Sequence, residues 1–196
     1  MRLILEKARL DTVRLNLIKS VCDSCRECRA WERPGNTTLP STSLPSKFNE
    51  EVECDLMFYK NEHIVFHIID RCIRFAACTE IPDKKMHTVL KAYITCWHQH
   101  EPAKVLYSDG EGALASDISK ELLRSMGTEL RIRAHGQHAT TIEARHGILR
   151  HLLHVMEEEL KSRNRPLEFD RLLHEAMFAS NAFTFYNGVS PYNALY

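Results

Sequence analysis

The amino-acid sequence predicts an α/β domain built around a mixed β-sheet, and two features of its pattern support this prediction. Three apolar runs, rich in the β-branched and aromatic residues typical of strands, follow one another at 51–59, 63–70 and 73–79. After them, segments with apolar residues at helical spacing alternate with short apolar runs, which is typical of strand–helix–strand units. The predicted order of elements is therefore βββαβαβαα.

The second and third apolar runs should form a tight hairpin, because only Arg71 and Cys72 lie between Asp70, where the second run ends, and the start of the third run. Two acids in these three runs, Asp55 and Asp70, are candidates for the first acid of a site. Asp70 lies beside the turn, where a carboxylate usually stabilises the turn itself. Asp55 lies inside the first strand, where a carboxylate needs a partner because buried acids are rarely unpaired. We therefore take Asp55 as the candidate site residue and assign Asp70 to the turn.

The second half of the sequence supplies the helices. A helix is expected over about 84–100, with its large apolar residues on one side. It leads to a short strand that ends at Asp109, and such a strand–helix–strand step implies parallel pairing through a right-handed crossover. The later elements are expected as helix, strand, loop, helix and helix, over 117–126, 130–133, 134–139, 143–162 and 167–186.

The first 48 residues are predicted to precede the sheet as an appendage. Residues 3–19 place leucines and a valine at helical spacing, which predicts a short helical segment. Cys22 and Cys25 form a C-x-x-C pair, which can supply part of a zinc site, although zinc requires four ligands; free reduced thiols are the alternative. Residues 33–46 are rich in Pro, Ser and Thr and predict a linker. The expected division of the chain is 1–31, 32–48 and 49–196.

Composition limits the function classes. The 196 residues include 26 basic and 26 acidic side chains, so the net charge is zero and any nucleic-acid contact must come from local basic patches. Seven cysteines, an odd number, without a signal peptide predict reduced thiols and an intracellular protein. No apolar run approaches the roughly 20 residues that a membrane helix needs, so no membrane partner is expected.

Three carboxylates are the candidate catalytic and metal-binding residues: Asp55, Asp109 and Glu143. Asp109 follows a strand, at the carboxyl edge where open α/β sheets carry their sites. Glu143 lies on the polar flank of its helix, because none of its neighbours at i+3, i+4, i+7 and i+11 is a large aliphatic residue. Three carboxylates drawn together raise one another's pKa unless a cation neutralises them, and Mg²⁺ prefers such oxygen ligands.

This pattern resembles the catalytic core of retroviral and LTR-retrotransposon integrases. The resemblance covers roughly Cys22 to Tyr196, and the early acid Asp55 matches the family's first catalytic acid. The matching stretches are 108–110 (SDG), 127–130 (GTEL), Gln137 six residues before Glu143, Asn181, 187–192 (NGVSPY) and 195–196 (LY).

The resemblance implies an RNase H-like fold, in which Asp55 lies on the central strand of a five-stranded mixed sheet flanked by helices. It also implies a polynucleotidyl transferase that uses two Mg²⁺ or Mn²⁺ ions to trim DNA 3′ ends and join them to target DNA. The three acids would hold the ions, with Asp55 shared by both. The implied partners are DNA of the element ends and the target, and further copies of the chain in a homodimer or higher oligomer. The implied place of action is the nucleus or a virus-like particle.

Four residues are the candidate DNA contacts, namely Gln137, Arg145, His146 and Arg150. The sequence departs from the family pattern in this region, because the usual Asn-Gly and Pro features are missing and Arg145 is displaced by one position. The family's zinc domain also has a His pair before the C-x-x-C step, and this chain begins after that point. We therefore expect the first 31 residues to be a zinc-domain remnant and the chain to be a fragment.

Two alternative functions remain open. The chain could be an inactive integrase remnant that binds DNA or dimerises, which the altered DNA-contact region favours and the retained acids oppose. It could also be an RNase H-type nuclease. Those enzymes place an essential Glu on the first crossover helix, whereas residues 84–100 contain no acid.

Overall fold

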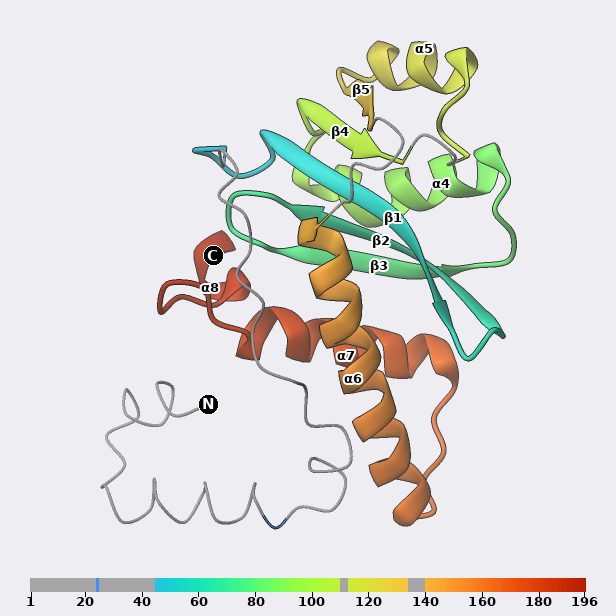
Figure 1. The fold of residues 1–196 in the computed structure, drawn as a ribbon, viewed down its shortest axis with the longest axis vertical. Coiled ribbons are helices and arrows are strands. Elements are labelled where there is room, and N and C mark those ends of the chain that lie inside the picture. Colours follow the sequence, from blue (N-terminus) through green and yellow to red (C-terminus); the bar gives the residue numbers. More distant parts are fainter. Residues whose placement is uncertain (1–23, 25–44, 110–112, 134–139) are drawn as a thin grey trace.

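The computed structural model describes residues 24, 45–109, 113–133 and 140–196. Within these ranges the chain forms a five-stranded mixed sheet with helices on both faces (Figure 1), so the predicted RNase H-like fold class is confirmed. Four sequence predictions fall outside the described residues: the helical segment over 3–19, the Cys22 and Cys25 pair, the linker before Pro45, and the loop that contains Gln137.

The sheet has the order β3-β2-β1-β4-β5, which places β1 at its centre. β1 pairs with β2, and β2 with β3, in antiparallel fashion, while β1 with β4 and β4 with β5 are parallel. The expected parallel crossover is present. The expected hairpin is also present, but its connection runs over residues 71–75 and not over Arg71 and Cys72 alone, because β3 begins at Ala76. The strands are β1 (Glu51–Tyr59), β2 (His63–Asp70), β3 (Ala76–Ile81), β4 (Val105–Ser108) and β5 (Glu129–Ile132).

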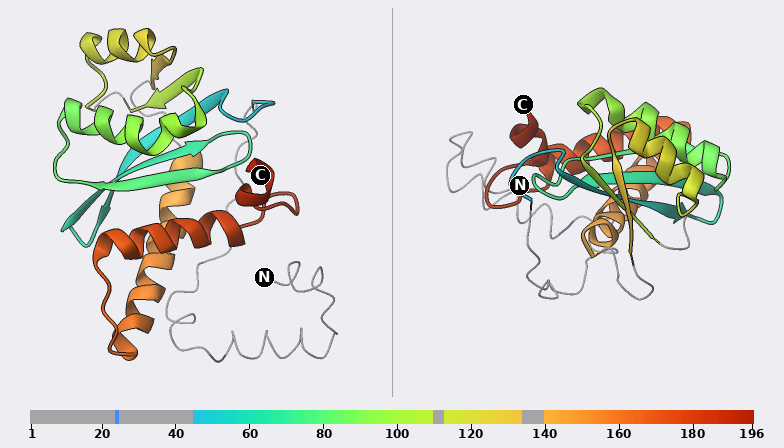
Figure 2. Two further views of the ribbon diagram at one scale, coloured as in Figure 1. Left: turned by 180° about the vertical axis from the view of Figure 1, so that it is seen from behind. Right: turned by 90° about the horizontal axis from the view of Figure 1, so that it is seen from above.

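The helices divide between the two faces of the sheet (Figures 1 and 2). The helices α4 and α5 contribute to one hydrophobic cluster, and α6 and α7 contribute to the other. None of the described helices is long and apolar enough to cross a lipid bilayer. Their bounds are α4 (Met86–Trp97, continued by the 3₁₀ turn η1, His98–His100), α5 (Asp117–Ser125), α6 (Thr140–Ser162), α7 (Phe169–Phe183) and α8 (Pro191–Leu195).

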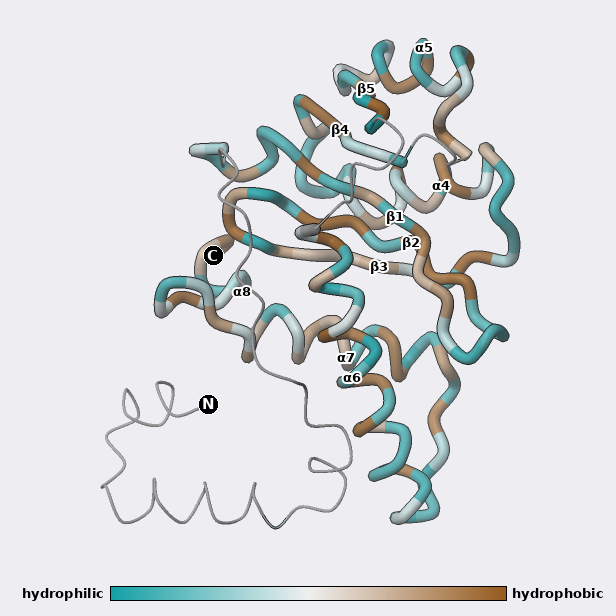
Figure 3. The backbone as a smooth tube through the Cα atoms, viewed as in Figure 1, coloured by the Kyte–Doolittle hydropathy of each residue, from teal (hydrophilic) through white to brown (hydrophobic). Residues whose placement is uncertain are grey.

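The alternation of side chains along β1 decides which face carries the candidate site. Val52 and Cys54 pack in the cluster under α4, whereas Met57 and Tyr59 pack in the cluster under α6 and α7. Because successive strand residues point to opposite faces, Asp55 points to the α6 side. In Figure 3 the strands carry much of the hydrophobic colour, while the far end of α6 is hydrophilic.

The hairpin turn is held by Asp70, as the sequence predicted. Its side chain is fully buried and accepts backbone N–H groups from Asn49 (2.9 Å), Cys72 (2.9 Å) and Ile73 (2.7 Å). These three bonds satisfy backbone donors at the turn and at the entry to β1, so the carboxylate is used structurally and does not belong to the candidate site.

The last helix was predicted over 167–186, and its predicted C-terminal end is wrong. α7 stops at Phe183, and a short bridge between Tyr186 and Val189 precedes α8. Thr184 ends the helix because its backbone is extended, with φ −88° and ψ 134°. Asn187 and Gly188, which have positive φ angles of 51° and 83°, then turn the chain before α8. The new helix then starts at Ser190, whose hydroxyl accepts the N–H of Asn193, with proline in its first turn.

Candidate functional site

Asp55 occupies the middle of the central strand, where its side chain is 27% exposed. Its Oδ1 accepts the backbone N–H of Leu56 at 2.7 Å. Oxygen Oδ2 lies on the side from which α6 approaches the sheet, 3.7 Å from Nδ1 of His146. The carboxylate is thus held at one oxygen and keeps lone pairs available for a further ligand.

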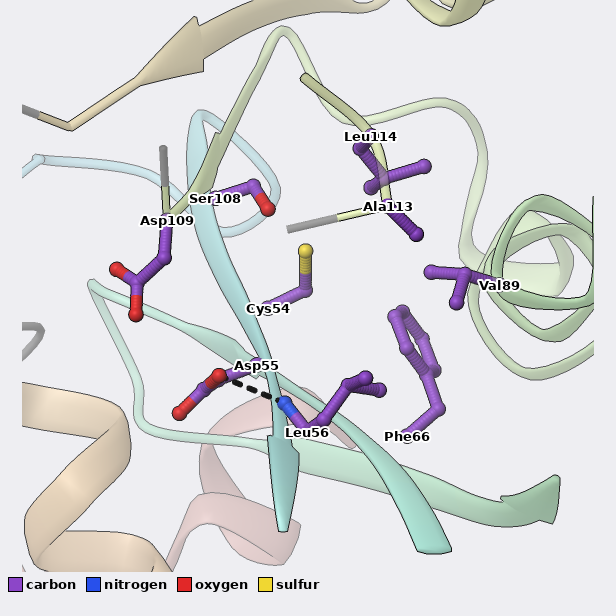
Figure 4. A pocket seen from close by; sticks show the side chains of 9 residues that line it. All are labelled: Cys54, Asp55, Leu56, Phe66, Val89, Ser108, Asp109, Ala113 and Leu114. Atoms are coloured by element: carbon purple, nitrogen blue, oxygen red, sulfur yellow. Dashed lines mark hydrogen bonds between the residues drawn. The ribbon is translucent and has the colours of Figure 1, made fainter. Parts of the chain in front are cut away.

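Asp109 directly follows β4, the parallel neighbour of β1. Glu53 on β1 is in register with Tyr107 on β4, so Asp55 and Asp109 are each one pleat further along the same face. Figure 4 shows both carboxylates pointing to the same side, away from the apolar side chains of Val89 and Leu114. The parallel pairing therefore brings two of the three predicted acids together at the carboxyl edge of the sheet.

Glu143 comes from the first turn of α6, and its side chain is exposed. α6 packs on β1 and β2, so its N-terminal turn lies over the strand that carries Asp55 (Figure 1). The three predicted acids consequently stem from a central strand, the end of its parallel neighbour, and a helix that crosses them.

The electrostatics of Asp55 report that the three acids converge. Burial, the largest cause, and the negative charges of Asp109 and Glu143 together raise the pKa of the Asp55 carboxyl to about 6. The N–H of Leu56 and the positive charge of Arg150 act in the opposite direction. A bound cation would relieve the repulsion between a carboxylate and two neighbouring negative charges.

The acids match a hard divalent cation in kind, because all offered donors are carboxylate oxygens. Within the described part of the chain, however, no group of three His, Cys, Asp or Glu residues is spaced to hold a metal ion. Coordination would therefore require the carboxylates of Asp55, Asp109 and Glu143 to move closer together.

A small cavity of about 30 Å³ adjoins Asp55 and Asp109 (Figure 4). Such a volume suits about one water molecule. Burial raises the pKa of the Cys54 thiol in its wall to about 12, so this cysteine is protonated and a poor nucleophile. The cavity is lined by Cys54, Asp55, Leu56, Phe66, Val89, Ser108, Asp109, Ala113 and Leu114.

Arg145, expected at the DNA surface, is instead internal. Its side chain is only 1% exposed and donates to Oδ1 of Asn181 at 2.8 Å and to the hydroxyl of Tyr186 at 3.1 Å. Two residues after Glu143, a helical side chain points about 200° around the axis. That rotation turns Arg145 away from the flank of Glu143 and toward the C-terminal part of the chain, so the expectation of DNA contact is corrected.

His146, also expected to contact DNA, is buried beside Asp55. Its ring lies against the ring of His67, with centroids 5.0 Å apart. His67 is a residue that the sequence prediction missed. The hairpin register pairs Asp55 with His67, so a correct strand alignment is the signal that would have identified it.

Arg150 is the predicted DNA contact that the structure leaves at the surface next to the acids. Its guanidinium Nε donates to the carbonyl of Phe58 at 3.4 Å, and its charge lowers the pKa of Asp55. Gln137 lies outside the described residues. The DNA contact therefore stays a prediction for Arg150 and Gln137.

No protein-family model matches the chain, and no curated protein matches it in sequence. Solved structures do match. A chain from a simian T-cell lymphotropic virus intasome, determined in complex with PP2A regulatory subunit B56 gamma, gives a TM-score of 0.66 at 17% identity over 97% of this chain and 72% of that one.

Two isolated catalytic cores give similar scores. The HTLV-2 integrase core in complex with magnesium, in its dimeric form, has a TM-score of 0.61 at 14% identity, covering 74% of this chain and 95% of that one. The BIV integrase core has a TM-score of 0.62 at 15% identity, covering 74% and 93%. At such identities the likeness is one of fold. The chain therefore has the fold of the retroviral integrase catalytic core.

Proposed function

We propose that this chain is a retroelement integrase-like polynucleotidyl transferase that cuts and joins DNA with divalent metal ions. The observation that carries the proposal is the placement of the three acids: Asp55 on the central strand, Asp109 at the end of its parallel neighbour, and Glu143 in the first turn of the helix that packs over them, on an integrase-like fold. Two acids at the carboxyl edge of a sheet and a third on the helix that packs over it repel one another, and such an arrangement favours a functional role over a structural one.

Asp55, Asp109 and Glu143 would hold Mg²⁺ or Mn²⁺ in this proposal, and two similar structures are described as magnesium complexes. Bound ions would supply activation of an attacking hydroxyl and stabilisation of the leaving oxygen at a phosphodiester. The protein's own contribution is orientation. The bond from Leu56 to Asp55 fixes one oxygen of the central acid, and α6 delivers Glu143 from above the strand.

DNA is the proposed substrate, and further copies of the chain are proposed partners. Similar structures are described as an intasome and as dimeric and trimeric integrase cores. Arg150 would contact a DNA phosphate from the flank of α6 that also carries Glu143. Action in the nucleus or a virus-like particle follows from the same proposal.

The zinc site is the least complete part of the proposal. Cys22 and Cys25 would supply two of the four ligands that a structural zinc ion needs. With residues 1–31 as the remnant of a zinc-binding domain and 32–48 as a linker, the core at 49–196 would carry the metal chemistry by itself.

A second function, an inactive remnant that only binds DNA or dimerises, is favoured by one observation. The described acids are not gathered at coordination distance. An RNase H-type nuclease is less favoured, because α4 and η1 contain no acid.

An assay on preformed branched DNA separates these functions. The purified chain is incubated with a labelled branched duplex in Mg²⁺, in Mn²⁺, or in EDTA. Metal-dependent reversal of strand transfer supports the transferase, whereas metal-dependent nicking without any joining supports the nuclease. Binding of the branched DNA without any metal-dependent product supports the remnant and contradicts the proposed activity.

A further inference from the structure

A buried pair of histidines lies directly behind Asp55. His67 is the cross-strand partner of Asp55, and directly opposed residues of an antiparallel pair project from the same face of the sheet. His146 reaches this place from α6, one helical turn after Glu143. The two rings meet with centroids 5.0 Å apart at an angle of 30°. One sheet residue and one helix residue thus form a wall against the central acid.

The two rings carry more unused polar atoms than packing explains. His67 is fully buried, and neither of its ring nitrogens has a hydrogen-bond partner. His146 is 4% exposed, and its Nε2 also lacks a partner. Buried polar groups are nearly always satisfied, and leucine or phenylalanine would fill the same space without this cost. A polar ring at His146 under such conditions indicates a use that packing does not provide.

The geometry gives that use to His146. Its Nδ1 is 3.7 Å from Oδ2 of Asp55, which is slightly beyond hydrogen-bonding distance, while the other oxygen is already held by the N–H of Leu56. A small rotation of the carboxyl group brings Oδ2 within reach. A neutral imidazole carries one N–H, so His146 can donate a hydrogen bond from Nδ1 to Oδ2 when that nitrogen holds the proton.

We infer that His146 is a positioning residue for Asp55, and that His67 holds the ring of His146 in place. When the acid binds a metal ion, the N–H at Nδ1 of His146 closes on Oδ2 and fixes the plane of the carboxylate. Partners of this kind orient metal-binding carboxylates and are required for full metal affinity. The inference rests on the proposed function, because that function assigns Asp55 as a metal ligand.

The test is the affinity of the full chain for Mn²⁺, measured by electron paramagnetic resonance of the free ion in three variants. His146→Leu removes the donor, and Mn²⁺ affinity should fall about 10- to 100-fold. His146→Asn keeps an amide donor near the position of Nδ1, and it should restore affinity to within about threefold of the original. His67→Phe keeps an aromatic wall and should also stay within about threefold.

His174→Leu is the matched control, because His174 is an exposed helical histidine on α7, where it pairs with Asp170 at 3.6 Å. This variant should leave Mn²⁺ affinity unchanged. Thermal midpoints are recorded for all variants. His146→Leu should not lower the thermal midpoint, since it removes an unsatisfied buried group. If His146 had a purely structural role, His146→Leu and His146→Asn would both lower the midpoint.

The outcomes separate the inference from the proposed function. Equal Mn²⁺ affinity in His146→Leu and the original chain overturns the positioning role while the proposed function stands. Equal losses in His146→Leu and His146→Asn also overturn it, because the donor is then irrelevant. If the original chain binds no Mn²⁺ but Asp55→Asn still abolishes DNA nicking in Mg²⁺, only the inference fails. If it binds no Mn²⁺ and cuts no DNA, both fall.

Discussion

The side-chain amide of Asn181 closes both backbone hydrogen bonds of Ala76 at the edge of the sheet. Its Oδ1 accepts the N–H of Ala76 at 3.0 Å, and its Nδ2 donates to the carbonyl of Ala76 at 2.7 Å. The same Oδ1 also accepts from Arg145 at 2.8 Å. β3 is an edge strand, so one amide both satisfies an open edge and accepts a hydrogen bond from the buried guanidinium of Arg145.

Asn181→Leu should therefore be strongly destabilising. It leaves the backbone groups of Ala76 and one donor of Arg145 buried without partners, which predicts a loss of about 2–5 kcal/mol in the free energy of unfolding. Urea denaturation followed by circular dichroism measures this loss. Asn193→Leu, at an exposed position of α8, is the control and should change stability by less than about 0.5 kcal/mol. A loss below about 1 kcal/mol for Asn181→Leu would show that water replaces the amide.

Asp55→Asn should abolish metal-dependent cleavage of branched DNA and leave the thermal midpoint unchanged or higher. The amide cannot replace a charged ligand, and its neutrality removes the repulsion from Asp109 and Glu143 that raises the pKa of Asp55. Asp70→Asn is an informative comparison, because Asp70 accepts three backbone bonds at the hairpin turn and should lose stability instead. Retention of cleavage in Asp55→Asn would remove this residue from the site.

The raised pKa of Asp55 also predicts a pH dependence of stability in the presence of EDTA. The folded-state pKa of about 6 lies above the unfolded reference of 3.8, so the folded chain binds this proton more tightly. Ionisation then costs the folded state stability as pH rises from about 4 to about 6. The stability of Asp55→Asn relative to the original chain should grow over that range by about 1–2 kcal/mol, after allowance for the solvent contact of the carboxyl. Denaturant titrations at pH 4, 5, 6 and 7, at roughly constant ionic strength, measure the difference. A difference independent of pH would mean that neither burial nor the neighbouring acids raise the pKa of Asp55 in the folded chain.

Arg150→Ala should weaken DNA binding and reduce the slope of log affinity against log salt by about one unit, as expected for loss of one phosphate contact. Fluorescence anisotropy with a duplex oligonucleotide at several salt concentrations gives both quantities. Arg163→Ala is the control, since Arg163 lies beyond the far end of α6 and pairs with Glu159 at 2.6 Å. An unchanged salt slope in Arg150→Ala would show that its bond to Phe58 is its whole role.

The sequence predicted the sheet and the places of Asp55 and Asp109 on it, because both depend on local pattern. Short apolar runs predict strands, and Asp109 directly follows one of them. Its place at the sheet edge could therefore be predicted without tertiary information. The sequence also assigned Asp70 correctly to the hairpin turn, because the hydrogen bonds that stabilise a turn are local.

The errors arose where contacts connect distant parts of the chain. Arg145 was assigned to the surface because its partner Asn181 lies 36 residues away, and a polar residue near Glu143 gives no local sign of burial. His67 was overlooked because its relation to Asp55 exists only in the register of the hairpin. His146 was misplaced for the same reason, since the wall that buries it comes from β2.

The length of α6 has a mechanical consequence. Its 23 residues extend about 35 Å, and Glu143 sits in the first turn while the hydrophilic far end projects past the sheet (Figures 1 and 3). A rigid rod of this length converts a tilt of about 5° around its contact with α7 into a displacement of roughly 1–2 Å at the acid. A force on the projecting end of α6 therefore changes the distance between Glu143 and the two aspartates.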